Sequence, residues 1–394
     1  MIKYLIIIIF ISFSAYGFDP LADFQFAPEQ PKEKESRFGG YLEYSARYAP
    51  KSGKLIQNRG KVFLEADYEK ERLFFYASAY AYYDSAPEDW QGDTEILRLY
   101  EAYARYNTER LDITAGNMML RWGTGDGINP MDILNPRDHL NPVAGARTDS
   151  RLPATMVQTV YAGDFFTAEA VFIPFAEVNE LPEQGSPWEN RSLNELRRNV
   201  PVESENKPDG TEGAARIYTT YNGWDAALLY YGGYADEPLL KYRNGSILPV
   251  YERIKAYGFN FAKGLSNGTL RGELAHKEGS FYGSGYTIGV IGFDRNFDND
   301  GYLNIQLFTD SEGKEGRGFT YEASDKYFNG DLKSGFRGTH YGDDSGGFEV
   351  FSEYYYADGF TLKSGIMLIY GKPSTVWGQY SDNDYVYTEF KFSF

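Results

Sequence analysis

The sequence predicts an all-β fold: a transmembrane antiparallel β-barrel of about eighteen strands. Three observations predict it. Segments of about ten residues alternate apolar and polar side chains, tyrosine, phenylalanine and glycine are abundant, and the chain ends in an alternating segment that closes on phenylalanine. Sixteen strands is the alternative count, because residues 317–340 are weakly patterned.

The first residues predict an export signal. Lys3 precedes an apolar stretch from Tyr4 to Phe13, and small residues follow at Ala15 and Gly17. A membrane-spanning helix needs about 20 apolar residues, roughly twice the length of this stretch. The predicted organisation is a signal peptide (1–17), a proline-rich periplasmic tail (18–37) and the barrel (38–394).

The composition favours a barrel over other exported proteins. The chain has 35 Tyr, 28 Phe and 42 Gly, and tyrosine collects where lipid meets water because its ring is apolar and its hydroxyl is polar. After the signal no apolar run is long enough for a membrane helix, which excludes a helical inner-membrane protein. The chain has no Cys, so we expect no disulfide and no Cys-linked haem. A net charge of −17 makes binding to nucleic acid unexpected.

The segments and their connections support one closed sheet. Even-numbered connections are generally short, whereas the odd-numbered ones include the three longest, 122–153, 176–211 and 235–251. Short periplasmic turns and long external loops are the asymmetry expected of an outer-membrane barrel. The predicted strands lie near 38–48, 57–68, 71–83, 95–107, 111–121, 154–163, 165–175, 212–222, 224–234, 252–263, 267–277, 284–294, 301–310, 317–326, 331–340, 346–356, 360–370 and 385–394.

The last segment is the most specific sign of a barrel. Phe390, Phe392 and Phe394 share one face, and Glu389 and Lys391 share the other. A terminal strand that ends on phenylalanine resembles the C-terminal signal of bacterial outer-membrane barrels. The resemblance implies that Phe394 is read by the barrel assembly machinery.

The stretch from residue 95 to residue 142 is the most distinctive part of the chain. It leads from two strands into Arg121-Trp-Gly-Thr-Gly-Asp126 and then into Asn129-Pro and Asn135-Pro. This pattern resembles porin-like barrels of the alginate-export kind and related uncharacterised outer-membrane families. The resemblance implies a channel in the outer membrane of a Gram-negative bacterium, with acidic sugars or other carboxylates as possible solutes.

The loop 122–153 is the candidate constriction of such a channel. Pro130, Pro136 and Pro142 fix φ at regular intervals, and the neighbouring Asn and Asp side chains can bond to local backbone, so the loop can be ordered. It either folds into the lumen or forms an external lid whose charges are solvated. The candidate constriction residues are Arg121, Trp122, Asp126, Asn129, Asp132, Asn135, Arg137 and Asp138.

Strand parity also predicts which charges face the lumen. Arg98 and Glu101 have opposite parity on one strand, so either a bulge intervenes or one of them faces outward. The predicted lumen-facing charges on the other strands are Arg216, Arg271, Glu273, Lys333, Arg337, Glu349, Glu353, Lys363, Glu389 and Lys391.

The sequence favours a channel for small hydrophilic solutes and not an enzyme. His139 follows Asp138, but the chain has only three His, and an isolated pair is weak evidence for catalysis. The run Asp294–Gly301 lacks the glycine and the acid that a calcium loop needs, so we expect no metal or cofactor. A barrel scaffold around a periplasmic or electron-carrying partner is the alternative, and a channel for hydrophobic substrates is less favoured. The expected partners are outer-membrane lipids, lipopolysaccharide and the solutes.

Overall fold

The computed structural model describes residues 35–89, 94–140, 150–190, 194–195, 198–203, 207–283, 285–297, 300–311 and 316–394. The predicted signal peptide, nearly all of the predicted tail and residues 141–149 of the predicted loop lie outside the described residues.

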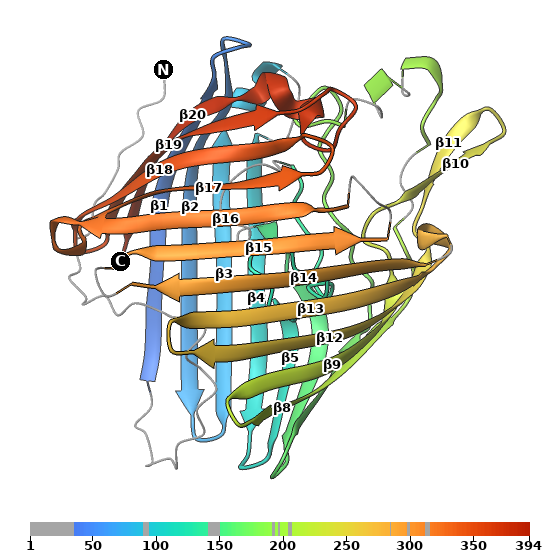
Figure 1. Cartoon of the computed structure of the whole chain (residues 1–394), viewed down its shortest axis with the longest axis vertical. Coiled ribbons are helices and arrows are strands. Elements are labelled where there is room, and N and C mark those ends of the chain that lie inside the picture. The colour runs from blue at the N-terminus through green and yellow to red at the C-terminus, as the bar shows by residue number, and fades with distance from the viewer. Residues whose placement is uncertain are drawn as a thin grey trace.

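The described residues form one closed antiparallel barrel of eighteen strands, which confirms the predicted fold class and the larger count (Figure 1). Strand β1 pairs with β2 on one side and with β20 on the other, and this second pairing closes the sheet. The barrel strands are β1 (Glu35–Ala49), β2 (Lys54–Lys70), β3 (Leu73–Asp84), β4 (Glu95–Asn107), β5 (Leu111–Met118), β6 (Ala154–Ala162), β7 (Thr167–Ile173), β8 (Glu212–Tyr221), β9 (Trp224–Tyr234), β12 (Arg253–Leu265), β13 (Gly268–Gly279), β14 (Tyr286–Asn296), β15 (Tyr302–Asp310), β16 (Gly318–Tyr327), β17 (Leu332–Tyr341), β18 (Gly346–Ala357), β19 (Phe360–Tyr370) and β20 (Tyr385–Ser393).

The strands lie close to their predicted positions. The weakly patterned residues 317–340 form β16 and β17, which excludes the sixteen-stranded alternative. Strand β1 begins at Glu35, inside the segment predicted as tail, because its first residues pair with the end of the long strand β2. Alternation of side chains along a strand is a local property, which is why the sequence predicts these segments well.

The barrel has an apolar outer face and a polar inner face. On β4, Leu97 and Leu99 are 85% and 60% exposed on the outside. On β15, Ile305 and Leu307 are exposed, whereas the alternate residue Gln306 is 2% exposed and faces inward. One face therefore suits an apolar medium and the other suits water or polar chain.

A bulge in β4 explains the parity of Arg98 and Glu101. The register of β3 against β4 shifts between Ala77 and Ala79, so one extra residue of β4 lies opposite β3. Beyond the bulge both charged side chains point inward: Arg98 donates to Glu180 at 2.7 Å, and Glu101 accepts from the backbone N–H of Met119 at 2.9 Å. Of the two alternatives left open by the sequence, the bulge is correct.

The two ends of the barrel differ in their connections. One end carries short turns such as those after β2, β8 and β18, and the other carries the long connections after β5, β7 and β9. The last of these contains a hairpin, β10 (Leu239–Arg243) with β11 (Ser246–Val250), that extends beyond the barrel (Figure 1). The described residues also form short 3₁₀ turns: η1 (Ala86–Asp89), η3 (Ser280–Tyr282), η4 (Phe328–Gly330) and η5 (Gly378–Asn383). Within the ranges given above, no helix is long and apolar enough to cross a membrane.

Candidate functional site

The described residues 119–140, here called the plug, leave the end of β5 and cross the interior of the barrel. Their contacts reach β7, β12, β13 and β15. Strand β15 is eight strands away from β5 around the eighteen-stranded sheet, so it lies almost opposite. The first part of the predicted loop 122–153 therefore bonds to side chains of the inner wall.

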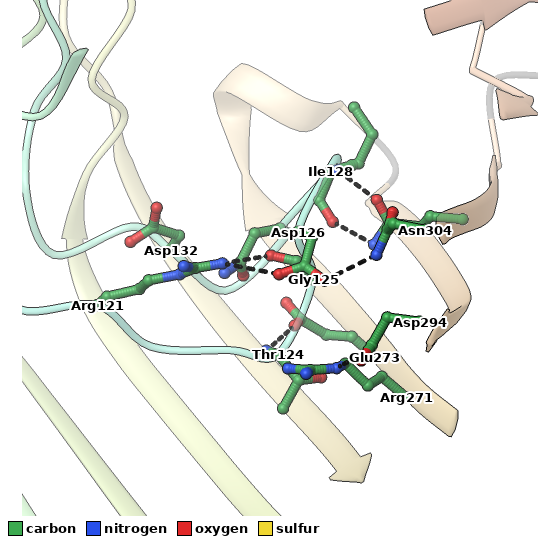
Figure 2. A network of polar contacts seen from close by, with 12 residues as sticks. Arg121, Thr124, Gly125, Asp126, Ile128, Asp132, Arg271, Glu273, Asp294 and Asn304 are labelled. Carbon is green, nitrogen blue, oxygen red and sulfur yellow. Dashed lines mark hydrogen bonds and ion pairs between the residues drawn. The ribbon is translucent and has the colours of Figure 1, made fainter. Parts of the chain in front are cut away.

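Glu273 of β13 holds the plug at one wall. Its carboxylate accepts the backbone N–H of Thr124 at 2.9 Å and that of Met131 at 2.6 Å (Figure 2). Glu273 is only 4% exposed. The two hydrogen bonds to its carboxylate compensate part of the free-energy cost of burying that charge.

Two amides of β15 hold the tip of the plug. The Gln306 side chain accepts the Ile128 N–H at 2.6 Å and donates to the Ile128 carbonyl at 3.1 Å. Asn304 donates to the Asp126 carboxylate at 3.0 Å (Figure 2). Arg121 completes the turn, donating to the Gly125 carbonyl at 2.7 Å with its guanidinium 3.7 Å from Asp126. The tip of the plug is therefore ordered.

Trp122 anchors the middle of the plug. Its side chain is 1% exposed, and its indole N–H donates to Glu169 of β7 at 3.0 Å. The Arg216 guanidinium bonds to the same carboxylate at 2.5 Å and lies 5.2 Å from the centroid of the Trp122 ring. Asn129 donates to the Trp122 carbonyl at 2.9 Å. A ring, a cation and a buried carboxylate thus fix this part of the plug to the wall.

The base of the plug is held by a buried carboxylate. Asp132 bonds to Arg151 and, at 2.7 Å, to Arg137, and its side chain is only 2% exposed. Asn135 accepts the Leu120 N–H at 2.7 Å and donates to the carbonyls of Met118 and Leu152 at 3.0 Å each. These bonds tie the two ends of the loop together at the point where it leaves the sheet.

The plug also bonds to the second long connection, between β7 and β8. The Arg137 N–H donates to the Asn179 side chain at 2.7 Å, and the His139 N–H donates to the Glu180 carbonyl at 2.8 Å. Burial raises the pKa of the Asp138 carboxyl, and burial lowers the pKa of the His139 imidazole, with Arg137 lowering it further. Burial therefore favours the neutral form of both side chains.

The eight constriction candidates therefore divide into two groups. Trp122, Asp132 and Asn135 are buried and hold the plug to itself or to the wall, and Asn129, Arg137 and Asp138 also bond within the plug. Arg121 and Asp126 keep side chains that are 36% and 37% exposed. Their side chains are more exposed than those of Arg137, at 27%, and Asp132, at 2%.

The predicted lumen charges lie on the inner wall, several of them in ion pairs. Arg216 and Glu273 contact the plug directly. The remaining pairs are Arg271 with Asp294 at 2.7 Å, Lys333 with Glu322 at 3.8 Å and Arg337 with Glu349 at 2.6 Å. Cross-strand register places Glu353 beside both Lys333 and Lys363, and Glu389 beside Lys363, while Lys391 lies over the Tyr41 ring. The wall is thus mixed in sign.

Strand alternation alone does not identify the residues that receive the plug. These are Glu169, Asn304, Gln306, Arg151, Asn179 and Glu180. The sequence does show that Asn304 and Gln306 face inward, because they alternate with Leu303, Ile305 and Leu307. It does not show their partners in the plug, 178 residues away.

Solved porin structures share the barrel architecture. OccK11 (OpdR) of Pseudomonas aeruginosa aligns with a TM-score of 0.54 at 8% identity, covering 92% of this chain and 95% of that one. OmpF of Salmonella typhi in complex with daunomycin aligns at 0.46 and 11% identity, covering 91% and 97%. A mutant porin of Rh. blastica aligns at 0.41 and 11% identity, covering 91% and 100%. These similarities concern the fold alone.

Similarity in sequence leads to one family. No curated protein matches the chain significantly. The family model described as "Protein of unknown function (DUF1302)" matches residues 45–288, which run from β1 into β14 and include the whole plug. Because this match spans more than half of the 394 residues, the chain belongs to the DUF1302 family.

Proposed function

We propose that the protein is an outer-membrane channel for small hydrophilic solutes and that the plug narrows its lumen. The observation that supports this best is the path of the plug, which bonds to β13 and β15 across the barrel from β5. A polar inner wall with an ordered segment across it is the usual arrangement of a selective pore.

The cellular setting belongs to the same proposal. The apolar outer face fits outer-membrane lipid and lipopolysaccharide of a Gram-negative bacterium, reached after cleavage of a signal peptide near Gly17. We include acidic sugars and other carboxylates among the solutes to be tested, because the sequence pattern of residues 95–142 resembles that of alginate-export porins.

The plug also bears on the alternative functions. A sleeve around a periplasmic or electron-carrying partner needs an open lumen, and the plug crosses it. A channel for hydrophobic substrates needs an apolar interior, whereas the inner wall carries the ion pairs described above. Asp138 and His139 bond to backbone of the plug and of the neighbouring loop, which fits a structural role better than a catalytic one.

Conductance of the refolded protein in planar bilayers tests the proposal. Charges at a narrow, water-poor passage act strongly on a permeating ion because Coulomb energy varies inversely with the dielectric constant. We expect Asp126→Asn to shift selectivity towards anions and Arg121→Gln to shift it towards cations. Charges more than about 8 Å from the ion path are screened at physiological salt.

The matched control is Asp164→Asn, which removes one negative charge from an exposed turn, where the side chain is 67% exposed. It should leave selectivity unchanged. Absence of conductance in the parent protein would overturn the channel, and unaltered selectivity in both plug variants would overturn the constriction.

A further inference from the structure

Four aromatic rings line one arc of the inner wall, here called the aromatic arc: Tyr41 of β1, Phe63 of β2, Tyr80 of β3 and Tyr100 of β4. Tyr41 stacks on Phe63 with a centroid distance of 4.9 Å and an interplanar angle of 10°. Phe63 is directly opposite Tyr80 in the sheet, and Tyr100 packs edge-on against both, at 6.1 and 5.4 Å. The rings form a continuous surface across four neighbouring strands.

This arc differs from the wall that receives the plug. Where the plug docks, Glu169, Glu273 and Gln306 are between 2% and 4% exposed. The four rings of the aromatic arc all remain partly exposed. The plug touches one edge of the aromatic arc, where the Tyr100 hydroxyl donates to the Met119 sulfur at 3.5 Å and to the Arg151 carbonyl at 3.1 Å. The partial exposure of Tyr41, Phe63 and Tyr80 leaves these three rings within reach of water and solutes in the lumen.

Charged groups of both signs border the rings. The Lys61 ammonium lies 4.9 Å from the centroid of Tyr80, and that of Lys391 lies 4.1 Å from the centroid of Tyr41. Between these lysines, Glu43 is the cross-strand neighbour of both. Glu65 is one step further along β2, and accepts a hydrogen bond from the Tyr76 hydroxyl at 2.7 Å. Arg98 lies opposite Tyr80 in the sheet and pairs with Glu180 at 2.7 Å, so the border carries both cations and carboxylates.

We propose that the aromatic arc is a binding track for uncharged saccharides. This inference rests on the proposed channel function and specifies its solute. The C–H faces of a sugar ring are apolar and pack on aromatic faces, while its hydroxyls both donate and accept hydrogen bonds. Lysines and carboxylates side by side satisfy both roles. A carboxylate solute would instead favour an excess of cations, which the balanced border does not provide.

Calorimetry on the full-length protein in detergent tests the track. The probes are maltotriose, a galacturonic acid trisaccharide and benzoate. We expect maltotriose to bind and Phe63→Leu to weaken it about fivefold, the scale of one lost aromatic contact. Phe63→Tyr keeps the ring and should restore binding.

The matched control is Phe351→Leu, an inner-wall aromatic on β18 beside Lys333 and Arg337, which should leave binding unchanged. Heat-modifiable gel migration checks that each variant is folded. Absence of maltotriose binding, equal weakening by Phe351→Leu, or binding of the charged probes alone would overturn the track. Bilayer conductance of the parent protein does not depend on these binding results. The channel proposal and the binding-track proposal can therefore be overturned independently.

Discussion

At the scale of single residues, a few buried carboxylates hold the plug through specific hydrogen bonds and ion pairs. Asp132 is enclosed by Arg137 and Arg151, and Glu273 by two backbone N–H groups. A buried carboxylate that is fully bonded fixes geometry, and removing it leaves its partners buried without compensation. Asp132 was predicted from the sequence as a gate charge, and its surroundings indicate an anchor.

Replacing Asp132 therefore tests the anchor. We expect Asp132→Asn to destabilise the docked plug by about 3–5 kcal/mol, because two arginines lose their buried counter-charge. Limited proteolysis should then cut the plug in variants whose barrel still shows heat-modifiable migration. Asp126→Asn, at a side chain that is 37% exposed, is the control and should stay protected. Equal protection of both variants would show that Asp132 is dispensable for docking.

His139 predicts how docking depends on pH. Burial lowers its pKa, with Arg137 lowering it further and Glu237 raising it. The docked state disfavours the imidazolium, so its stability is full above the ordinary histidine pKa of about 6.5 and falls as the pH drops through that value. Protection factors of plug amides, which are corrected for the intrinsic pH dependence of hydrogen exchange, should be lower at pH 5 than at pH 7.5, and this difference should be smaller in His139→Gln. An identical pH dependence in both proteins would contradict this assignment.

At the scale of elements, the wall beneath the plug is shaped to receive it. A side chain built at Gly258 of β12 would lie 2.6 Å from the Cγ and sulfur of Met131, which is fully buried. Ala256 and Ala275, on the same patch, are also fully buried. Small residues on β12 and β13 thus leave room for the plug, as dense packing requires.

Filling that space should disturb docking. We expect Gly258→Ala to cost about 1–3 kcal/mol, because the added methyl group displaces Met131. Gly264→Ala on the same strand is the control, since a side chain there meets nothing within 4 Å. Thermal unfolding and proteolysis of the plug should separate the two variants. Equal behaviour would show that Met131 shifts without cost.

At the scale of the whole molecule, the barrel closes between β1 and β20. Gly40 and Phe394 exchange backbone hydrogen bonds of 3.0 and 2.9 Å at the end of this seam. Each such bond contributes only about 0.5–1.5 kcal/mol net, which is small beside the seventeen other strand pairings of the sheet. The terminal ring should therefore matter more for assembly than for the stability of the finished barrel.

We expect Phe394→Ala to lower the amount of barrel in the outer membrane and to raise the amount in the periplasm. Phe390→Ala is the control, because Phe390 of β20 has the same parity as Phe394, which directly follows β20, and both residues are 44% exposed. Cell fractionation with heat-modifiable migration measures both pools. Equal insertion of the two variants would show that the terminal position carries no assembly signal.

The sequence by itself determined the positions of the barrel strands and their two faces, and it left the number of strands between eighteen and sixteen. Alternation is a property of neighbouring residues, so Val62 and Leu64 can be assigned to the face opposite Phe63 and Glu65 without knowledge of any other strand. Parity also placed the lumen charges on the inner wall, and it left Arg98 and Glu101 open until the bulge was seen.

Only the tertiary structure decided the path of the plug. Thr124 and Glu273 are 149 residues apart, and Ile128 and Gln306 are 178 apart, so no local pattern connects them. A polar residue on the inner wall can contact either water or another segment of the chain. Strand alternation is the same in both cases, so it does not distinguish them. Closure of the sheet brings β13 and β15 opposite β5, and that geometry converts a charged loop into a segment anchored across the lumen.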